Sequence, residues 1–248
     1  MRVLYLSRPP RWLLALRIPR HPHRLAHGCV AAALCFSVGA LPLLAAAEPL
    51  RSDSAPAPGL VDAAARVPGL MVDLKYATTD NFMKQNVYGS LRRCFLRPEA
   101  AAKLAEAARE LHALRPDLRL LAYDCARPLA VQEKMWRLVR GTPSEPYVAD
   151  PRKGSMHNFG CAVDLTLADK GGRPLDLGTP YDAAGARAQP RQDVALLKTG
   201  QISSAQLANR LLLRLVMVRG GFFPLDIEWW HFDCALPASA RRRFKRIP

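Results

Sequence analysis

Histidine is scarce in this chain of 248 residues, which contains six in all. Three of them fall within the first 47 residues, so only His112, His157 and His231 remain for the rest of the chain. His112 lies in the last turn of an expected helix, where an imidazolium favours the helix dipole, and we interpret it as structural. The other two lie in short segments that also carry carboxylates, which makes these segments the candidates for chemistry.

Acidic residues are absent from the first 47 residues, which hold six arginines. An apolar stretch from Cys29 to Leu44 follows this basic leader, and Ala45, Ala46 and Ala47 close it. A basic start, an apolar run and small residues at its end are typical of a secretory signal peptide. The pattern predicts a signal peptide over 1–47 and an exported, periplasmic protein. An uncleaved membrane anchor is the alternative, because the apolar stretch approaches the length of a membrane span.

Nucleic-acid-binding motifs are also missing, although the chain has 36 basic and 21 acidic residues. Removing the six arginines of the leader leaves 30 against 21, a net charge of +9. Without a motif, and with export expected, we exclude nucleic acid as a partner. Part of the excess lies at 241–248, which we interpret as a solvated basic tail. The alternative is a weak contact of this tail with an anionic envelope surface.

No internal repeat occurs, and the length beyond the leader suits one domain with a core of its own. A segment rich in Pro, Ala and Ser predicts a linker over 48–66, followed by a single domain over 67–240. Helices alternate in blocks with hairpin-like strands, which predicts an α+β fold with a central, mostly antiparallel sheet flanked by helices. The expected strands are 72–76, 118–123, 161–167 and 227–234, and the expected helices are 98–114, 129–139 and one from Ser203 or Ser204 to Arg219.

Four cysteines remain beyond the leader, namely Cys94, Cys125, Cys161 and Cys234. Four cysteines in an exported protein are compatible with two disulfides, and three pairings exist. Buried free thiols, or a thiolate ligand for a metal, are the alternatives. Spacing alone does not choose among them.

The segments Ser155–Asp164 and Glu228–His231 together hold two imidazoles and two carboxylates. A catalytic zinc site needs three protein ligands, an open position for water and a base. We therefore predict one Zn²⁺ per chain, placed on the sheet, with His157, Asp164 and His231 as ligands. Glu228 would be the general base. Chance burial of two core histidines and an aspartate is the alternative.

The spacing requires two departures from a straight strand. An odd number of residues separates His157 from Asp164, so a turn at Gly160 is expected to bring them together. The same holds between Glu228 and His231, so we expect a bulge at Trp229 and Trp230, with both rings as walls of the pocket.

Arg127 follows an expected strand and precedes a proline, a rigid position from which a guanidinium can reach the site. A fixed cation there could stabilise the oxyanion of a tetrahedral intermediate. The alternative is a surface ion pair with Asp124.

These segments resemble the D-alanyl-D-alanine dipeptidase family of zinc peptidases, which is related to the D,D-carboxypeptidases. The likeness extends over about 67–236 and includes the segments 73–82, 87–89, 94–98, 124–128 and 228–233. It implies that Arg127 is the oxyanion-stabilising arginine. It also implies that Tyr76, Ser155 and Asp182 hold the dipeptide, with Asp182 facing the substrate ammonium.

The resemblance further favours a Cys94–Cys125 disulfide, and leaves Cys161 and Cys234 to pair or stay reduced. It implies an enzyme that hydrolyses the D-Ala-D-Ala dipeptide, a small peptidoglycan building block. The first alternative is a D,D-carboxypeptidase that releases terminal D-Ala from longer muropeptides. The second is a non-catalytic envelope-binding domain, which would have no need for a general base beside an open metal position.

Overall fold

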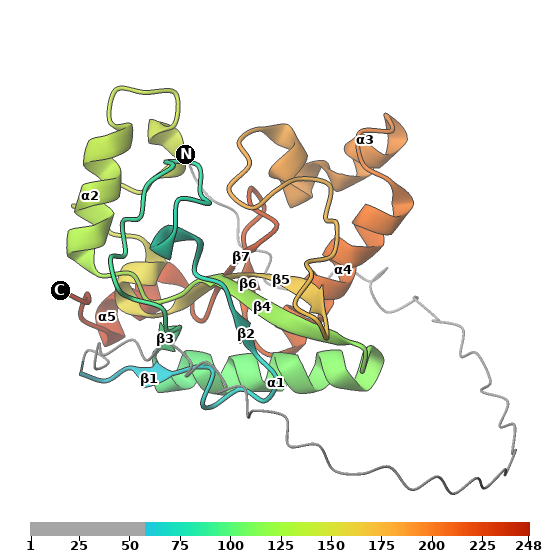
Figure 1. Cartoon of the computed structure of the whole chain (residues 1–248), viewed down its shortest axis with the longest axis horizontal. Helices are drawn as coiled ribbons and strands as arrows, with labels where there is room; N and C mark the ends of the chain where they lie inside the picture. The colour runs from blue at the N-terminus through green and yellow to red at the C-terminus, as the bar shows by residue number, and fades with distance from the viewer. Residues whose placement is uncertain (1–57) are drawn as a thin grey trace, which may run out of the picture. The chain divides into compact units, whose positions relative to one another are not determined.

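A mixed five-stranded sheet forms the centre of the protein, as shown by a computed structural model that describes residues 58–248 (Figure 1). The sheet order is β2-β4-β5-β7-β6; β2 pairs in parallel with β4, and the other pairs are antiparallel. The predicted α+β fold with a mostly antiparallel sheet is confirmed. The strands are β2 (Met71–Val72), β4 (Leu118–Asp124), β5 (Ala162–Asp169), β6 (Phe223–Pro224) and β7 (His231–Asp233).

Two long helices cover one face of this sheet. The first, α1 (Pro98–Leu114), begins at a proline, whose missing N–H costs nothing in a first helical turn. It packs against α4 (Ser204–Arg219) and β4, and runs beneath the strands in Figure 1. Both helices have the predicted bounds, and the side chain of Ser203 caps α4.

Because the α1–α4 layer covers β5, this strand is buried along almost its whole length. Leu165 and Leu167 belong to the core that also includes Leu104 and Leu111 of α1. Asp164 alternates with these leucines and therefore points to the other face of the sheet. The core thus fixes the strand that carries one of the predicted ligands.

The remaining α-helices of residues 58–248 are shorter: α2 (Leu129–Val139), α3 (Asp193–Lys198) and α5 (Pro237–Arg243). In Figure 1, α2 lies on the opposite side of the strands from α1. The bounds of α2 match the prediction, with Pro128 directly before the helix. No helix in this part of the chain is both long and apolar enough to cross a membrane. The predicted signal peptide, and the anchor that was its alternative, lie outside the described residues.

Two predicted strands are shorter than expected. The prediction of a strand at 72–76 is wrong beyond Val72, because residues 75–77 form the 3₁₀ helix η2 (Lys75–Ala77). There the carbonyl of Tyr76 accepts hydrogen bonds from the amides of Val87 and Tyr88, a loop contact that sequence alternation does not reveal. The prediction of a strand at 227–234 is wrong before His231, where β7 begins.

Both ends of the described region pack against the domain. Within the segment predicted as a linker, β1 (Val61–Asp62) pairs with β3 (Phe95–Leu96). At the other end, Ile247 is buried and its amide donates to the carbonyl of Asn158. In residues 241–248, which we interpreted from sequence as a solvated basic tail, the cationic residues are exposed and Ile247 anchors the end of the segment to the domain.

Two disulfides join the elements around the sheet. Cys94 is bonded to Cys125, which confirms the preferred pairing, and Cys161 is bonded to Cys234. The second bond resolves the open question of whether these two cysteines pair. A thiolate ligand for a metal is thereby excluded for all four.

Candidate active site

A capped 3₁₀ helix and the glycine that ends it position His157. The side chain of Ser155 caps the 3₁₀ helix η4 (Met156–Phe159), and the Asn158 side chain accepts a hydrogen bond from the amide of Ser155. Gly160 ends this helix with φ of +66°, in the left-handed region that favours glycine. The expected turn at Gly160 is therefore present, and the chain enters β5 two residues later.

Asp164 and His231 come together because their strands are neighbours. In the antiparallel pair of β5 and β7, Asp164 lies directly opposite His231. Directly opposed residues on such a pair project from the same face of the sheet. The sheet register therefore places a carboxylate and an imidazole side by side, and η4 adds the second imidazole.

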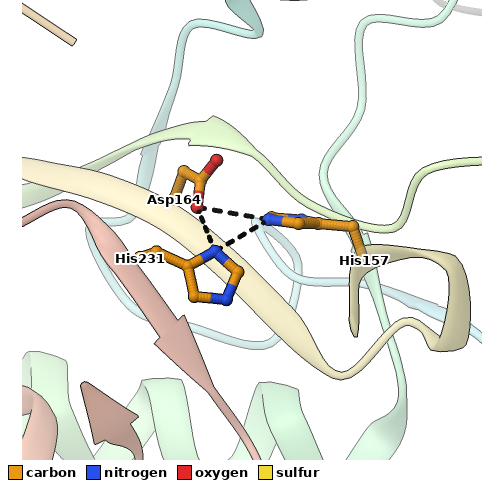
Figure 2. A group of neighbouring side chains, drawn as sticks. All are labelled: His157, Asp164 and His231. Atoms are coloured by element: carbon orange, nitrogen blue, oxygen red, sulfur yellow. Dashed lines mark hydrogen bonds and ion pairs between the residues drawn. The ribbon is translucent and has the colours of Figure 1, made fainter. Parts of the chain in front are cut away.

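Three donor atoms converge at this point, as Figure 2 shows. The Nε2 atom of His157 lies 3.2 Å from Oδ1 of Asp164 and 3.2 Å from Nδ1 of His231, and the last two atoms are 2.9 Å apart. Tetrahedral zinc with bonds of about 2.1 Å separates its ligand atoms by roughly 3.4 Å. The observed separations are close to that value, so the residues fit a zinc ion.

Hydrogen bonds orient both imidazoles toward the shared point. Nδ1 of His157 lies 2.7 Å from the carbonyl oxygen of Cys125, and Nε2 of His231 lies 2.9 Å from Oδ1 of Asp233. Because each of these acceptors takes an N–H, the opposite ring nitrogen of each histidine keeps its lone pair for a metal. Tyr181 donates to Oδ2 of Asp164 at 2.9 Å, which leaves Oδ1 facing the two histidines.

The buried charges shift the acidity of these groups. Although burial opposes ionisation, the histidines hold the pKa of Asp164 below its usual range. Burial likewise opposes the charge of His231, yet the carboxylates of Asp233 and Asp164 raise its pKa well above the usual value. The carboxylates of Asp164 and Asp233 thus favour positive charge at the position of His231.

Arg127 is buried in the wall of the cavity beside this cluster. Its Nε donates to Oδ2 of Asp124 at 3.1 Å, its Nη2 donates to the same oxygen, and its Nη1 donates to Gln132 at 2.8 Å. Burial opposes the charge, but Asp124 raises the pKa of Arg127 well above the usual value. The ion pair that we considered as an alternative role exists, but it is buried rather than on the surface.

Glu228 lies in the loop between β6 and β7, ahead of the strand in which sequence placed it. Its side chain is half-buried and lines the same cavity as His157, Asp164 and His231. Within residues 58–248 its carboxylate has no hydrogen-bond partner, so it is open to a bound water. Burial raises the pKa of Glu228 above its usual value, which makes the carboxylate a stronger base.

The two tryptophans before His231 face different cavities. Trp230 lines the cavity of the ligand cluster, as expected, whereas Trp229 lines a neighbouring one. The indole of Trp229 donates to Oγ1 of Thr179 at 2.8 Å, and its backbone amide donates to the carbonyl of Ala188. The prediction that both rings are walls of one pocket is therefore wrong for Trp229.

The residues expected to hold a dipeptide also line the cavity. The hydroxyl of Tyr76 donates to Oδ2 of Asp182 at 2.9 Å, and Ser155 lies at the start of η4. Asp182 has φ of +60°, a strained conformation for a residue other than glycine. Burial raises its pKa well above the usual value, with a further contribution from the charge of Asp164.

All eight residues selected from the sequence line a single cavity of about 490 Å³. This volume is within the range of sites that bind small molecules. The eight are Tyr76, Arg127, Ser155, His157, Asp164, Asp182, Glu228 and His231.

Comparison with known proteins identifies the family of this chain. The sequence profile of the D-ala-D-ala dipeptidase family matches residues 56–247. The chain belongs to this family. It is 36% identical to the D-alanyl-D-alanine dipeptidase of Escherichia coli (strain K12) over 180 residues, which cover 73% of this chain and 86% of that protein.

Two further relatives carry the same name. The D-alanyl-D-alanine dipeptidase of Streptomyces coelicolor is 31% identical over 192 residues, and that of Enterococcus faecium is 30% identical over 186. Each alignment covers 67% of this chain and 86% of the relative. As a member of this peptidase family, the chain is an enzyme.

Several residues of the site were not selected from the sequence. Asp233 bonds to His231, Tyr181 bonds to Asp164, and Gln132 bonds to Arg127. Tyr88 donates to the other oxygen of Asp124. These residues are ordinary core or loop types in the sequence, and only Asp233, two positions after His231 on the same strand, could have been found from its spacing.

Proposed function

We propose that this enzyme uses one zinc ion to hydrolyse the D-Ala-D-Ala dipeptide. The observation that carries the proposal is the single cavity that gathers the three ligand side chains with Glu228 and Arg127. Family membership supports dipeptide hydrolysis, and the named relatives support this substrate.

A zinc ion held by His157, Asp164 and His231 would supply a Lewis acid that polarises the scissile carbonyl and acidifies a water molecule. Glu228 accepts the proton of the attacking water at its open carboxylate. The same carboxyl then passes this proton to the leaving nitrogen, so that water and one dipeptide yield two D-alanine molecules.

Arg127 stabilises the negative charge that develops on the carbonyl oxygen. Three of its five N–H groups are used by Asp124 and Gln132, which hold the guanidinium rigidly. Two donors remain for the oxyanion. Because the guanidinium is fixed before the reaction, it needs no reorganisation as the charge forms.

Asp182, oriented by Tyr76, binds the free ammonium of the dipeptide. In the free cavity its carboxylate is disfavoured by burial and by nearby anions, and a substrate ammonium would offset both effects. A D,D-carboxypeptidase acts on longer peptides that have no ammonium at this place. A half-buried carboxylate in the cavity of the ligand cluster therefore favours the dipeptidase over that alternative.

Product analysis by mass spectrometry tests the proposal. The zinc-loaded protein is incubated with D-Ala-D-Ala and, separately, with a longer peptide that ends in D-Ala-D-Ala. We expect cleavage of the dipeptide alone. Release of D-Ala from the longer peptide would instead identify a D,D-carboxypeptidase, and folded, zinc-loaded protein that cleaves neither would support the binding domain.

Export to the periplasm is a further part of the proposal. The basic leader supports it, and so do the two disulfides, because such bonds persist in oxidising compartments. Exposed cations near the C-terminus, Arg242 and Lys245, would add a weak attraction to an anionic envelope surface. Cell fractionation, with the mass of the mature N-terminus, tests whether cleavage follows Ala47.

A further inference from the structure

Arg241 belongs to the basic C-terminal segment, yet its side chain lines the catalytic cavity. It lies on α5, which packs against η4, the helix that carries His157. The sequence offered no reason to separate Arg241 from the other cations of this segment. Among the cationic residues of 241–248, all of which the structure describes, Arg241 is the one whose side chain lines the cavity.

The guanidinium of Arg241 is held in place by the backbone beside Ser155. Its Nη1 donates to the carbonyl of Lys153, and its Nη2 donates to the carbonyl of Gly154 at 3.2 Å. The guanidinium carbon also lies 5.4 Å from the ring centroid of Phe159. Two of five N–H groups are used in these bonds, so three remain for a ligand.

The charges that line the cavity show what this cation could bind. A free dipeptide carries an ammonium at one end and a carboxylate at the other. Among the described residues that line the cavity, the cationic side chains are Arg127 and Arg241. Arg127 is buried against the carboxylate of Asp124, whereas Arg241 is exposed and has no carboxylate partner in the described structure.

The cavity also contains four carboxylates, which repel the carboxylate end of a dipeptide. These are Asp164, Asp182, Glu228 and Asp233. Binding of the carboxylate therefore requires a cation that is not already paired. A guanidinium is suited to this role, because its planar donors match the two oxygens of a carboxylate.

We propose that Arg241 binds the C-terminal carboxylate of the substrate and thereby selects peptides with a free C-terminus. This inference rests on the proposed dipeptidase function. It gives the two charged ends of the dipeptide separate partners, with Asp182 beside Tyr76 for the ammonium and Arg241 beside Ser155 for the carboxylate.

Kinetics with two substrates test this proposal. D-Ala-D-Ala is compared with its C-terminal amide, which keeps the ammonium and lacks the negative charge. We expect Arg241→Ala to raise KM for the dipeptide roughly tenfold, with little change in kcat, because a charge-assisted hydrogen bond is lost. KM for the amide, or its inhibition constant if it binds without being cleaved, should change less than about twofold, since that contact is already absent. Arg241→Lys should restore part of the affinity for the dipeptide.

Two control variants separate recognition from structure. Arg246→Ala removes hydrogen bonds to the carbonyls of Pro151 and Arg152 in the same loop. Arg246 does not line the cavity, so this variant reports on loop anchoring. Arg242→Ala removes one exposed positive charge from the same helix. Both variants should retain the KM of the unaltered protein for the dipeptide.

The outcomes distinguish this inference from the proposed function. An equal rise in KM for the dipeptide and the amide, or the same rise in Arg246→Ala, would overturn the role of Arg241 and leave the dipeptidase function intact. Failure of the unaltered, zinc-loaded protein to cleave the dipeptide would instead overturn the proposed function, and the role of Arg241 with it.

Discussion

The candidate metal-ligand cluster of His157, Asp164 and His231 lies on paired strands and the short helix before them. Glu228 and Asp182, in contrast, lie in loops, and Arg241 lies on the C-terminal helix. Asp164 and His231 are fixed by sheet register and by buried hydrogen bonds. Glu228, in contrast, has no hydrogen-bond partner among the described residues. The difference indicates that the fold fixes the three candidate ligands firmly and leaves the carboxylate of Glu228 open to substrate and water.

This comparison predicts that changes in the cluster remove the metal, whereas changes in the loops spare the metal and impair turnover. The largest effect is expected for His231→Ala, which removes one of three ligands. We expect zinc bound per chain to fall close to zero and activity to fall by on the order of 1000-fold or more. Metal analysis of the dialysed protein measures the zinc content, and an assay of dipeptide cleavage measures the activity.

His112→Ala is the matched control for that experiment. His112 is exposed in the last turn of α1 and does not belong to the cluster. The His112→Ala variant should therefore retain zinc and activity. Unchanged zinc content in His231→Ala would show that His231 is not a ligand.

Glu228→Ala should separate metal binding from turnover. Since Glu228 lies outside the cluster, the variant should keep its zinc, while kcat falls by about 100- to 10,000-fold because the general base is lost. Glu228→Gln preserves the size of the side chain and should be equally impaired. Zinc-replete protein with full activity would contradict the role of Glu228.

A smaller effect is expected from the residue that orients His231. Asp233 is fully buried and accepts the N–H of the imidazole. Asp233→Ala should weaken zinc affinity by roughly 10- to 100-fold, as is typical when a carboxylate behind a metal-ligating histidine is lost. Competition with a chelator measures the affinity.

Asp233→Asn provides the conservative comparison, because an amide oxygen can still accept the hydrogen bond. It should retain more affinity than Asp233→Ala at a similar melting temperature. Equal affinities for Asp233→Asn, Asp233→Ala and the unaltered protein would show that the orientation of His231 is set by the strand alone.

The smallest effect is expected for Tyr181→Phe, which removes one hydrogen bond to Oδ2 of Asp164 and keeps the ring. A single bond of this kind corresponds to a change in zinc affinity of about tenfold at most. Tyr123→Phe is the control, since that ring packs 5.0 Å from the ring of Tyr181 without a bond to the cluster. A similar loss in both variants would point to a general effect of removing a tyrosine hydroxyl rather than to the hydrogen bond with Asp164.

Prediction from the sequence was most successful where a local signal marks the structure. Pro98 marks the start of α1 and Ser203 caps α4, and both helices have the predicted bounds. The glycine turn that brings His157 to Asp164 was likewise foreseen from spacing. Such signals act within a few residues, so the local sequence contains them in full.

Prediction from the sequence was least successful where contacts between residues distant in the chain decide the local structure. The strand expected at 72–76 ends early because Tyr76 bonds to the loop at Val87 and Tyr88. The charges of the C-terminal segment are exposed, as its sequence indicates, but the burial of Ile247 against the domain could not be foreseen. A contact between distant segments leaves no periodic pattern in either of them.

By itself, the sequence determined which side chains could form a zinc site and which helices would frame it, because ligand types and helix caps are local properties. The tertiary structure decided how these side chains are oriented and which charges face the substrate. Asp233 and Arg241 line the cavity only because sheet register and the packing of α5 bring them there. The hydrogen bond from Tyr181 to Asp164 likewise exists only in the folded chain. Hydrogen bonds and charge interactions act over a few ångströms in space, and only the folded chain defines those distances.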